Sequence, residues 1–284
     1  MRTDRNATVA ARRRPVAVIG VVLAVAATLL VGTARVPCDV MAAQPTCWVA
    51  VEPGPMFDTR GLVDVAGDHV ERTGTGILLT TIAVEEHLDL GEWGRAIVSS
   101  STATVRREAL FPAGSDAAAV RRGHRLAMAS SQLDAIVAGL RATGHLGPDE
   151  HVVPGALPVD VRIEAGDIGG PSAGLAFALA VVEVLGGRDL TGELVVAVTG
   201  SIDADGQVAA VGGVRQKIAG ASRGPSRADV FLVPRANLGA ARSAPVDADL
   251  LVVPVDDLVG ALDALTQLAS GGLPDGSLQI VARR

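Results

Sequence analysis

Tyrosine is absent from this sequence of 284 residues, and aromatic residues of all kinds make up only 2% of it. A protein surface that stacks nucleic-acid bases on aromatic rings is therefore not expected. The formal net charge of −6 argues in the same direction, because phosphate binding requires a basic face. We expect no nucleic-acid partner, and a core built from small aliphatic side chains.

Cysteine is nearly absent too, with Cys38 and Cys47 as the two examples. No histidine or third cysteine surrounds them, so a zinc site is not expected. Outside the cytoplasm this pair can close a small loop as a disulfide. None of the five histidines shows a metal-binding spacing, and all five precede residue 152, which predicts surface or loop histidines. We expect neither a metal ion nor a cofactor.

Lysine is the scarcest charged residue, because the 25 basic side chains include one lysine, Lys217. Arginine stays protonated in proteins, whereas a buried lysine can lose its proton. One interpretation is that the amine at this position must be neutral to work. The other is that a coding bias has replaced lysine with arginine elsewhere, and that Lys217 is a surface residue left by chance.

Charge is also missing from Val16 to Val31, an apolar run that follows three arginines, Arg12 to Arg14. The run predicts a transmembrane helix or signal anchor over residues 15–32, with residues 1–14 in the cytoplasm. The rest of the chain is then extracytoplasmic, and the protein belongs to the cell membrane. A cleaved signal peptide and a secreted product form the alternative, since Gly32 to Ala34 are small enough for a cleavage site.

Beyond the apolar run, we expect irregular structure with short strands over residues 33–73, where proline and glycine recur. The main domain is predicted over residues 74–284. Its first half contains a strand at 74–84, a helix at 88–98 and a long helix at 115–144. The long helix has a predicted packed face, made of Val120, Leu126, Leu133, Ile136, Val137 and Leu140.

After a predicted linker at residues 145–158, strands and helices alternate. Strands are expected at 159–165, 192–202, 206–211, 228–234 and 249–255, and helices at 172–187, 214–222 and 256–270. The predicted fold class is α+β with α/β-type alternation.

The stretch DIGGPSAGLAFALA, residues 167–180, places Ser172 at the start of an apolar helix. Gly169 and Gly170 allow a peptide ligand to approach the backbone closely. The free backbone N–H groups from Gly170 to Ala173 can stabilise an oxyanion. The simpler interpretation is that Ser172 only caps the helix.

Ser172 and Lys217 together suggest chemistry that neither suggests alone. A serine hydroxyl is a poor nucleophile until a base removes its proton, and a neutral lysine can be that base. Val214, Ile218 and Ala219 surround Lys217 in the sequence, so its amine is expected to be shielded from water, which lowers its pKa.

Three stretches, GGPSAG, TGSIDADGQVAAVGGVRQKIAGA and VFLVPRAN, resemble the proteolytic domain of Lon proteases in order and spacing. The resemblance is strongest over residues 155–255 and weaker over residues 74–143. It implies a Lon-type proteolytic fold, with Ser172 as nucleophile, Lys217 as general base and Thr199 as the residue that orients the lysine. It also implies a homo-oligomeric ring.

The sequence departs from that family at several points. Gly169 stands where the family usually has an acidic residue, and Asp167 lies two positions earlier. A chain with one lysine, in GGVRQK, contains no nucleotide-binding P-loop. The pattern is thus closest to membrane-anchored, ATPase-free bacterial Lon-like proteases, but without their PDZ module, since residues 145–158 are too few for it.

The sequence therefore predicts an ATP-independent, membrane-anchored serine endopeptidase that cuts unfolded or flexible protein segments. The alternative is a catalytically silent Lon-like scaffold or peptide-binding protein at the membrane. The loss of the acidic residue at Gly169 permits this alternative, whereas the retention of Ser172 with the single lysine argues against it.

Overall fold

The computed structural model of the chain describes residues 38, 44–65, 76–111, 117–150, 152, 157–166, 168 and 170–282. The predicted membrane segment at residues 15–32, and the basic stretch before it, lie outside these ranges. In the part that is described, no helix combines the length and the apolar character that crossing a membrane requires.

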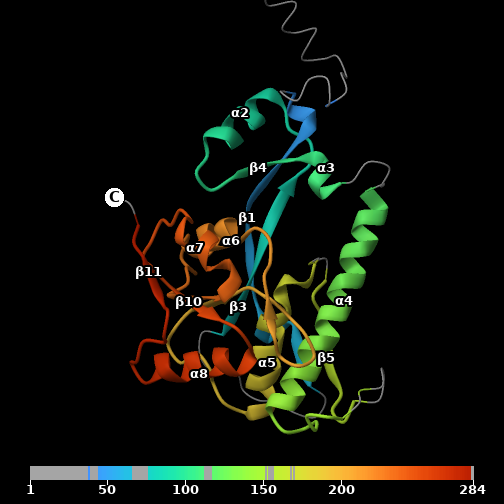
Figure 1. Ribbon diagram of the computed structural model, residues 1–284, viewed down its shortest axis with the longest axis vertical. Helices are drawn as coiled ribbons and strands as arrows, with labels where there is room; N and C mark the ends of the chain where they lie inside the picture. Colours follow the sequence, from blue (N-terminus) through green and yellow to red (C-terminus); the bar gives the residue numbers. More distant parts are fainter. Residues whose placement is uncertain are drawn as a thin grey trace, which may run out of the picture.

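A seven-stranded sheet runs through the described domain in the order β11-β10-β9-β6-β3-β1-β4 (Figure 1). Its strands in chain order are β1 (Trp48–Asp58), β3 (Ile77–Glu85), β4 (Ala103–Arg106), β6 (Val196–Val198), β9 (Val230–Pro234), β10 (Leu250–Val255) and β11 (Leu278–Ile280). Two smaller sheets pair β2 (Val63–Val65) with β5 (Val161–Ile163), and β7 (Ser201–Ile202) with β8 (Val208–Ala209).

The four central strands, β10, β9, β6 and β3, are parallel, and the flanking pairs are antiparallel. Side chains of the central strands alternate between two apolar clusters. In β6, for example, Val196 and Val198 belong to one cluster, whereas Ala197 belongs to the other. Because both faces are buried, these strands are almost continuously apolar in sequence, as parallel strands usually are.

Helices cover both faces of the sheet (Figure 1). The α-helices are α2 (Leu90–Val98), α3 (Arg107–Leu110), α4 (Ala117–Ala142), α5 (Gly174–Gly186), α6 (Val214–Ala221), α7 (Leu238–Arg242) and α8 (Leu258–Ala269). Short 3₁₀ turns are η1 (Pro45–Cys47), η2 (Thr59–Gly61), η3 (Pro171–Ala173) and η4 (Arg235–Asn237). The resulting fold is a mixed α/β fold whose central sheet is parallel.

Helix α5 lies at the centre of one layer and is buried from Gly174 to Val184. It packs on the sheet and is covered by α4 and α8, with which it shares the larger apolar cluster. Helices α6 and α7 cover the other face and contribute to the second cluster. The start of α5 and the body of α6 are thus on opposite faces of the same sheet.

The prediction of irregular structure with short strands over residues 33–73 agrees with β2, which has three residues, but was wrong for β1. This strand has 11 residues and pairs with β3 on one side and with β4 on the other. Pro53 and Pro55 lie in the stretch where the register between β1 and β3 shifts. A bulge of this kind accommodates residues that cannot donate a ladder hydrogen bond, so the prolines did not exclude a strand.

Most other predicted elements occur in the described residues near their expected positions. The strand expected at 192–202 is instead divided into β6 and β7, which belong to different sheets, and the packed face of the long helix contains one error. Helix α4 buries Ile136, Val137 and Leu140, as expected, but Leu126 is 73% exposed. Leu126 lies in the first half of α4, which extends past the layer that covers its second half (Figure 1).

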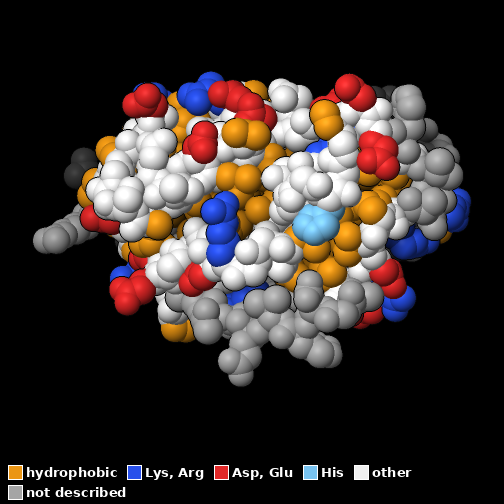
Figure 2. Space-filling model, turned by 90° about the horizontal axis from the view of Figure 1, so that it is seen from below, with side chains coloured by type: hydrophobic (Ala, Val, Ile, Leu, Met, Phe, Trp, Pro, Cys, Tyr) orange, Lys and Arg blue, Asp and Glu red, His pale blue; other side chains and the backbone are white. Residues whose placement is uncertain are grey.

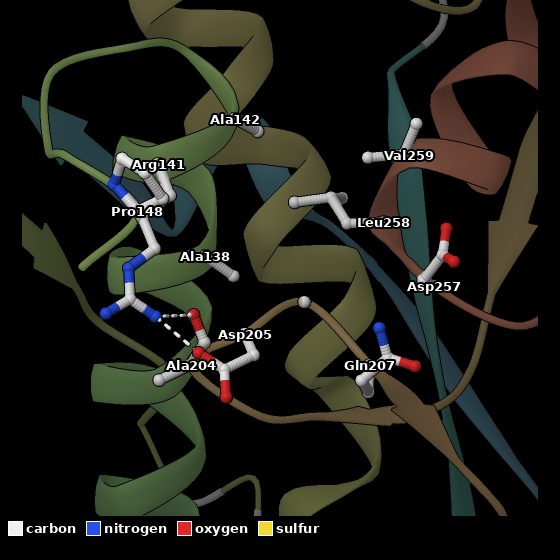
Figure 3. A pocket seen from close by; sticks show the side chains of 11 residues that line it. Ala138, Arg141, Ala142, Pro148, Ala204, Asp205, Gln207, Asp257, Leu258 and Val259 are labelled. Carbon is white, nitrogen blue, oxygen red and sulfur yellow. Dashed lines mark hydrogen bonds and ion pairs between the residues drawn. The ribbon is translucent and has the colours of Figure 1, made fainter.

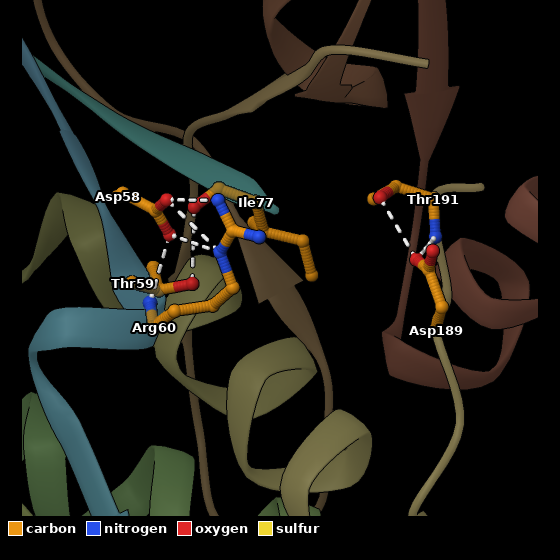
Figure 4. Close-up of polar contacts among 6 residues, drawn as sticks. All are labelled: Asp58, Thr59, Arg60, Ile77, Asp189 and Thr191. Atoms are coloured by element: carbon orange, nitrogen blue, oxygen red, sulfur yellow. Dashed lines mark hydrogen bonds and ion pairs between the residues drawn. The ribbon is translucent and has the colours of Figure 1, made fainter. Parts of the chain in front are cut away.

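A polar corner joins the end of β1 to the start of β3 (Figure 4). Asp58 accepts a hydrogen bond from the backbone N–H of Arg60 and forms an ion pair with its guanidinium. Between them, Thr59 Oγ1 donates to the carbonyl of Ile77 at 3.0 Å. This corner fixes where β3 begins.

A separate polar contact follows α5, where Asp189 accepts hydrogen bonds from the backbone N–H and the hydroxyl of Thr191.

A disulfide lies at one end of the described domain. At the end where β1 begins, Cys38 and Cys47 form a disulfide, and α2, β4 and α3 lie close by (Figure 1). The opposite face, seen from below, has hydrophobic, acidic and basic side chains interspersed (Figure 2). The pairing of the cysteines agrees with the expectation that they can close a small loop.

Candidate active site

Ser172 lies in the 3₁₀ turn η3, directly before helix α5. The residue before this turn, Gly170, has φ +89°, a conformation that side chains with a Cβ atom rarely adopt. Pro171 occupies the first position of the turn, where its missing N–H costs no hydrogen bond. The local sequence therefore projects the serine from a sharp turn at the head of a buried helix.

Lys217 lies in the middle of α6 and is only 3% exposed. The helix begins after Gly213, which has φ +70° and packs against Ile82 of β3. Ile218 and Ala219, its neighbours in sequence, are fully buried. Burial disfavours the charged amine and lowers the pKa of Lys217 to about 8.

The amine of Lys217 reaches two hydroxyl groups. Its Nζ atom lies 2.7 Å from Ser172 Oγ and 2.9 Å from Thr199 Oγ1, and both are hydrogen-bond distances. Among the described residues, the loss of hydration on burial is the cause of the lowered pKa of Lys217. The structure thus brings together the three side chains that the sequence predicted, from three separate segments.

Thr199 is fully buried at the end of β6, and its hydroxyl bonds in two directions. It donates to the carbonyl of Ser172 at 3.3 Å, so its oxygen is left to accept from the lysine amine. A neutral amine that donates to Thr199 has its lone pair free for the hydroxyl of Ser172. Thr199 therefore lies where it can hold the lysine amine beside the serine.

The backbone after Thr199 holds the serine turn in place. Gly200 N–H donates to the carbonyl of Ser172 at 2.9 Å, and Leu175 N–H donates to the carbonyl of Gly200 at 3.0 Å. From the other side, Ser131 Oγ of α4 donates to the carbonyl of Pro171 at 3.0 Å. Ser131 was not among the predicted site residues, because no motif marks a serine that acts through a neighbouring backbone.

The backbone amides near Ser172 are not all available to an oxyanion. Gly170 N–H donates to the carbonyl of His124 in α4 at 3.4 Å, so its expected oxyanion role is wrong for this arrangement. Among the described residues outside its own turn, no backbone carbonyl accepts from the N–H of Ser172. Ala173 follows in η3 and is 3% exposed. Asp167 and Gly169, two further predicted site residues, lie outside the described residues.

A cavity of about 650 Å³ opens beside Ser172 and Lys217. Aliphatic and aromatic side chains supply most of its wall, from β1, β3, β4, α3 and the start of α4: Val51, Ile82, Val84, Val105, Leu110, Phe111 and Val120. Of the described residues on this wall, Glu86 and His124 are charged or titratable, besides Lys217. Such a pocket suits an apolar segment of a ligand with a few polar contacts.

Among the described residues, no histidine side chain hydrogen-bonds to Ser172, Thr199 or Lys217. His87, His124 and His145 are all exposed, as expected, whereas His69 and His151 lie outside the described residues. His124 nevertheless lines the cavity, which its position in the sequence did not reveal. Within the described ranges, no group of acidic, histidine or cysteine side chains is arranged to hold a metal ion.

A second cavity, of about 350 Å³, lies at the C-terminal end of α4 (Figure 3). Arg141 forms one wall and donates to Asp205 Oδ1 at 2.7 Å and to the carbonyl of Ala204 at 2.8 Å. Leu258 and Val259, at the start of α8, form part of the opposite wall. None of the described lining side chains is a serine, threonine, cysteine, histidine or lysine, so these residues supply no nucleophile with its base.

Comparison with known families matches residues 145–266 to the Lon protease (S16) C-terminal proteolytic domain. Lon protease 1 of Herpetosiphon aurantiacus is 40% identical over 97 residues, which are 34% of this chain and 10% of that protein. Lon protease of Vibrio parahaemolyticus is 38% identical over 107 residues, or 37% of this chain and 12% of that protein.

Lon protease of Erwinia amylovora is 34% identical over 131 residues, which are 45% of this chain and 15% of that protein. The matched segment contains Ser172, Thr199 and Lys217. The chain thus corresponds to a small part of each of these relatives.

Proposed function

Because residues 145–266 match the Lon protease (S16) C-terminal proteolytic domain, we propose that this chain is a serine endopeptidase with a Ser–Lys dyad. Ser172 is the nucleophile and Lys217 is the general base. The observation that carries the proposal is the 2.7 Å contact between Ser172 Oγ and the amine of Lys217, a residue that is 3% exposed. A buried amine with a pKa of about 8 is partly neutral near physiological pH and can accept a proton.

The reaction proceeds in two halves. Lys217 takes the proton of Ser172 as Oγ attacks the peptide carbonyl, and it then gives this proton to the departing amine, which leaves an acyl-serine. Lys217, neutral again, takes a proton from water as the water attacks the ester, and it then gives this proton to Ser172 Oγ as the second product leaves with its new carboxyl group. The N–H of Ser172 stabilises the negative oxygen formed in both halves.

Thr199 positions the base through both halves. The hydroxyl of Thr199 donates its hydrogen bond to the carbonyl of Ser172 throughout the reaction. Its oxygen therefore accepts from the amine whether the lysine is neutral or charged. This contact holds Nζ beside Ser172 Oγ after proton transfer, when hydrogen bonding to the serine weakens. Thr199 thereby keeps the proton close to the leaving group.

The substrate is an extended, flexible segment of a protein. β3 pairs with β1 from Leu78 to Glu85, but with β6 only from Ile77 to Leu79. The described domain therefore has no strand beside β3 from Thr80 onward, on the side of the cavity. An extended peptide can add to this edge, whereas a folded chain cannot present its backbone there.

Two finer parts of the proposal rest on the sequence. Hydrolysis needs no ATP in this chain, because the single lysine is the proposed base and no P-loop motif occurs. Residues 15–32 anchor the chain in the cell membrane, with the dyad on the extracytoplasmic side. Assembly into a homo-oligomeric ring is supported by the family resemblance alone, and sedimentation of the purified chain tests it.

Casein hydrolysis by the purified full chain, without nucleotide, tests the catalytic proposal. We expect the native chain to cleave casein, and Ser172→Ala and Lys217→Arg to be inactive while remaining folded by circular dichroism. Ser243→Ala is the matched control, because Ser243 is exposed and its hydroxyl bonds only to the carbonyl of Ala240. Equal cleavage by the native chain and by Ser172→Ala would leave a peptide-binding scaffold as the better description.

A further inference from the structure

Both tryptophans of the chain lie in one small lobe at the end of the sheet, here called the tryptophan lobe (residues 44–50 and 86–111). Trp48 begins β1, and Trp93 is in α2. The two half-buried rings pack against a separate apolar cluster of Ala50, Leu88 and Ala96. This lobe is distant from the larger clusters that hold α5 and α8 in the body of the domain (Figure 1).

Helix α2 exposes an apolar stripe on this lobe. Leu90 is 59% exposed, Ile97 is 53% exposed, and Val98 at the end of the helix is 82% exposed. Leu90 and Ile97 are seven residues apart, so they lie on one side of the helix, two turns from each other. Ala96 faces the lobe and is buried, whereas Glu92 and Arg95 occupy the remaining polar side.

The chain enters the domain through this same lobe. Cys38 is joined by the disulfide to Cys47, the last residue of η1, and η1 contacts α3. The uncharged apolar run in the sequence ends at Val31, seven residues before Cys38. Seven residues span at most about 25 Å when fully extended. If that run crosses the bilayer, the tryptophan lobe is held within about this distance of the lipid surface.

We propose that the tryptophan lobe rests on the bilayer, with Leu90, Ile97 and Val98 inserted at the boundary between lipid headgroups and acyl chains. This inference depends on the membrane anchoring in the proposed function, and it is independent of the Ser–Lys chemistry. Apolar side chains on one helix face and tryptophan beside them are typical of segments that lie in the membrane interface.

The alternative occupant is a second copy of this chain, and the size of the stripe argues against it. A stable interface between proteins buries about 800 Å² on each partner, around an apolar core of many residues. Three partly exposed aliphatic side chains on a helix of nine residues supply much less than this. Shallow insertion of these side chains in lipid needs no complementary protein surface. The adjacent membrane anchor also keeps the tryptophan lobe at a high local concentration near the bilayer.

The two tryptophans allow a direct test, because they are the chain's own fluorescent reporters. The full chain is reconstituted in phosphatidylcholine vesicles with either normal or brominated acyl chains, and tryptophan emission is compared. We expect at least a twofold stronger quenching by the brominated lipid for the native chain than for Leu90→Ser/Ile97→Ser/Val98→Ser. Val98→Ser alone, at the most exposed of the three positions, serves if the triple variant does not fold.

The matched control is Val259→Ser/Leu273→Ser/Val281→Ser, which changes three aliphatic residues that are 62–65% exposed outside the lobe. This control should be quenched like the native chain. The inference would be overturned if brominated lipid did not quench the tryptophan emission of the vesicle-bound native chain. It would also be overturned if the α2 variants changed the oligomeric state of the chain instead of its quenching. Failure of the chain to float with vesicles overturns it as well.

Casein hydrolysis by the same vesicles is recorded separately, so a failed membrane contact is distinguishable from a failed peptidase. The tryptophan emission of Ser172→Ala should be quenched as strongly as that of the native chain, because the Ser–Lys dyad is not part of the tryptophan lobe.

Discussion

The hydroxyl of Ser131 in α4 donates to the carbonyl of Pro171, the residue that immediately precedes the nucleophile Ser172. Ser131 is 3% exposed, and its Oγ atom lies so close to Gly174 that a Cβ added to this glycine would be 2.7 Å from it. Helix α4 thus braces the turn that projects the serine, although none of its side chains contacts the lysine amine.

Replacement of Ser131 by alanine should lower kcat for peptide hydrolysis by about tenfold and leave KM nearly unchanged. The lost hydrogen bond contributes about 1 kcal/mol, and the turn that carries Ser172 becomes less well positioned. Steady-state kinetics with a fluorogenic peptide measure this split, and Ser131→Thr should restore part of kcat. Ser130→Ala, at the exposed neighbouring position, is the control. A change in KM alone would contradict a positioning role.

Replacement of Thr199 by valine should reduce kcat by about 10- to 100-fold. The variant keeps the shape of the side chain but removes the oxygen that accepts from Lys217 Nζ at 2.9 Å. The amine then has no fixed orientation toward Ser172 Oγ. Thr59→Val is a matched control, because Thr59 is equally buried and its hydroxyl donates to a carbonyl of β3. If both variants lose the same activity, loss of stability and not orientation is the cause.

The pH profile of kcat/KM should rise about tenfold per pH unit below pH 8 and level off above it. The pKa of Lys217 is lowered to about 8 by burial, and only the neutral amine can accept the proton of Ser172. In the folded protein, acidification through about pH 8 protonates the amine of Lys217, and this removes the neutral form that acts as the base. Initial rates with a peptide that has no titrating groups measure the profile, and a flat profile from pH 6 to 9 contradicts a lysine base.

Replacement of Gly213 by alanine should abolish most activity and destabilise the domain. Gly213 has φ +70°, and an added Cβ would meet Ile82 Cγ2 at 2.7 Å, so the start of α6 must shift. A shift of the helix displaces Lys217 from Ser172. Gly212→Ala is the adjacent control, since no atom lies within 4 Å of its added Cβ. Thermal unfolding and casein hydrolysis distinguish the two variants, and equal effects would contradict the packing argument.

Sequence reasoning found the dyad because its residues occur in ordered motifs and because Lys217 has no competitor among the basic residues. The central strands and α5 were predicted for a similar reason, since they are apolar over long runs. The β1 strand was missed because Pro53 and Pro55 resemble loop residues, and only the bulge against β3 accommodates them. A bulge depends on the partner strand, which a local pattern does not contain.

Contacts through the backbone were equally hidden from the sequence. Ser131 and His124 affect the catalytic turn through the carbonyl of Pro171 and the N–H of Gly170, and neither contact requires a particular motif. Leu126 was assigned to the packed face of α4 because its spacing suits that face, but α4 is longer than the layer that covers it. Periodicity predicts which side of a helix is apolar, and not how far the neighbouring helix extends.

The burial of Lys217 has a practical consequence for chemical labelling. Apart from the α-amino group, the sequence offers an amine-directed reagent one primary amine, and in the folded domain that amine is reached through the cavity beside Ser172. An aldehyde or activated ester of suitable size would therefore act as a titrant of competent sites. The labelled fraction, read from the mass of one peptide, would count the molecules that are ready to react.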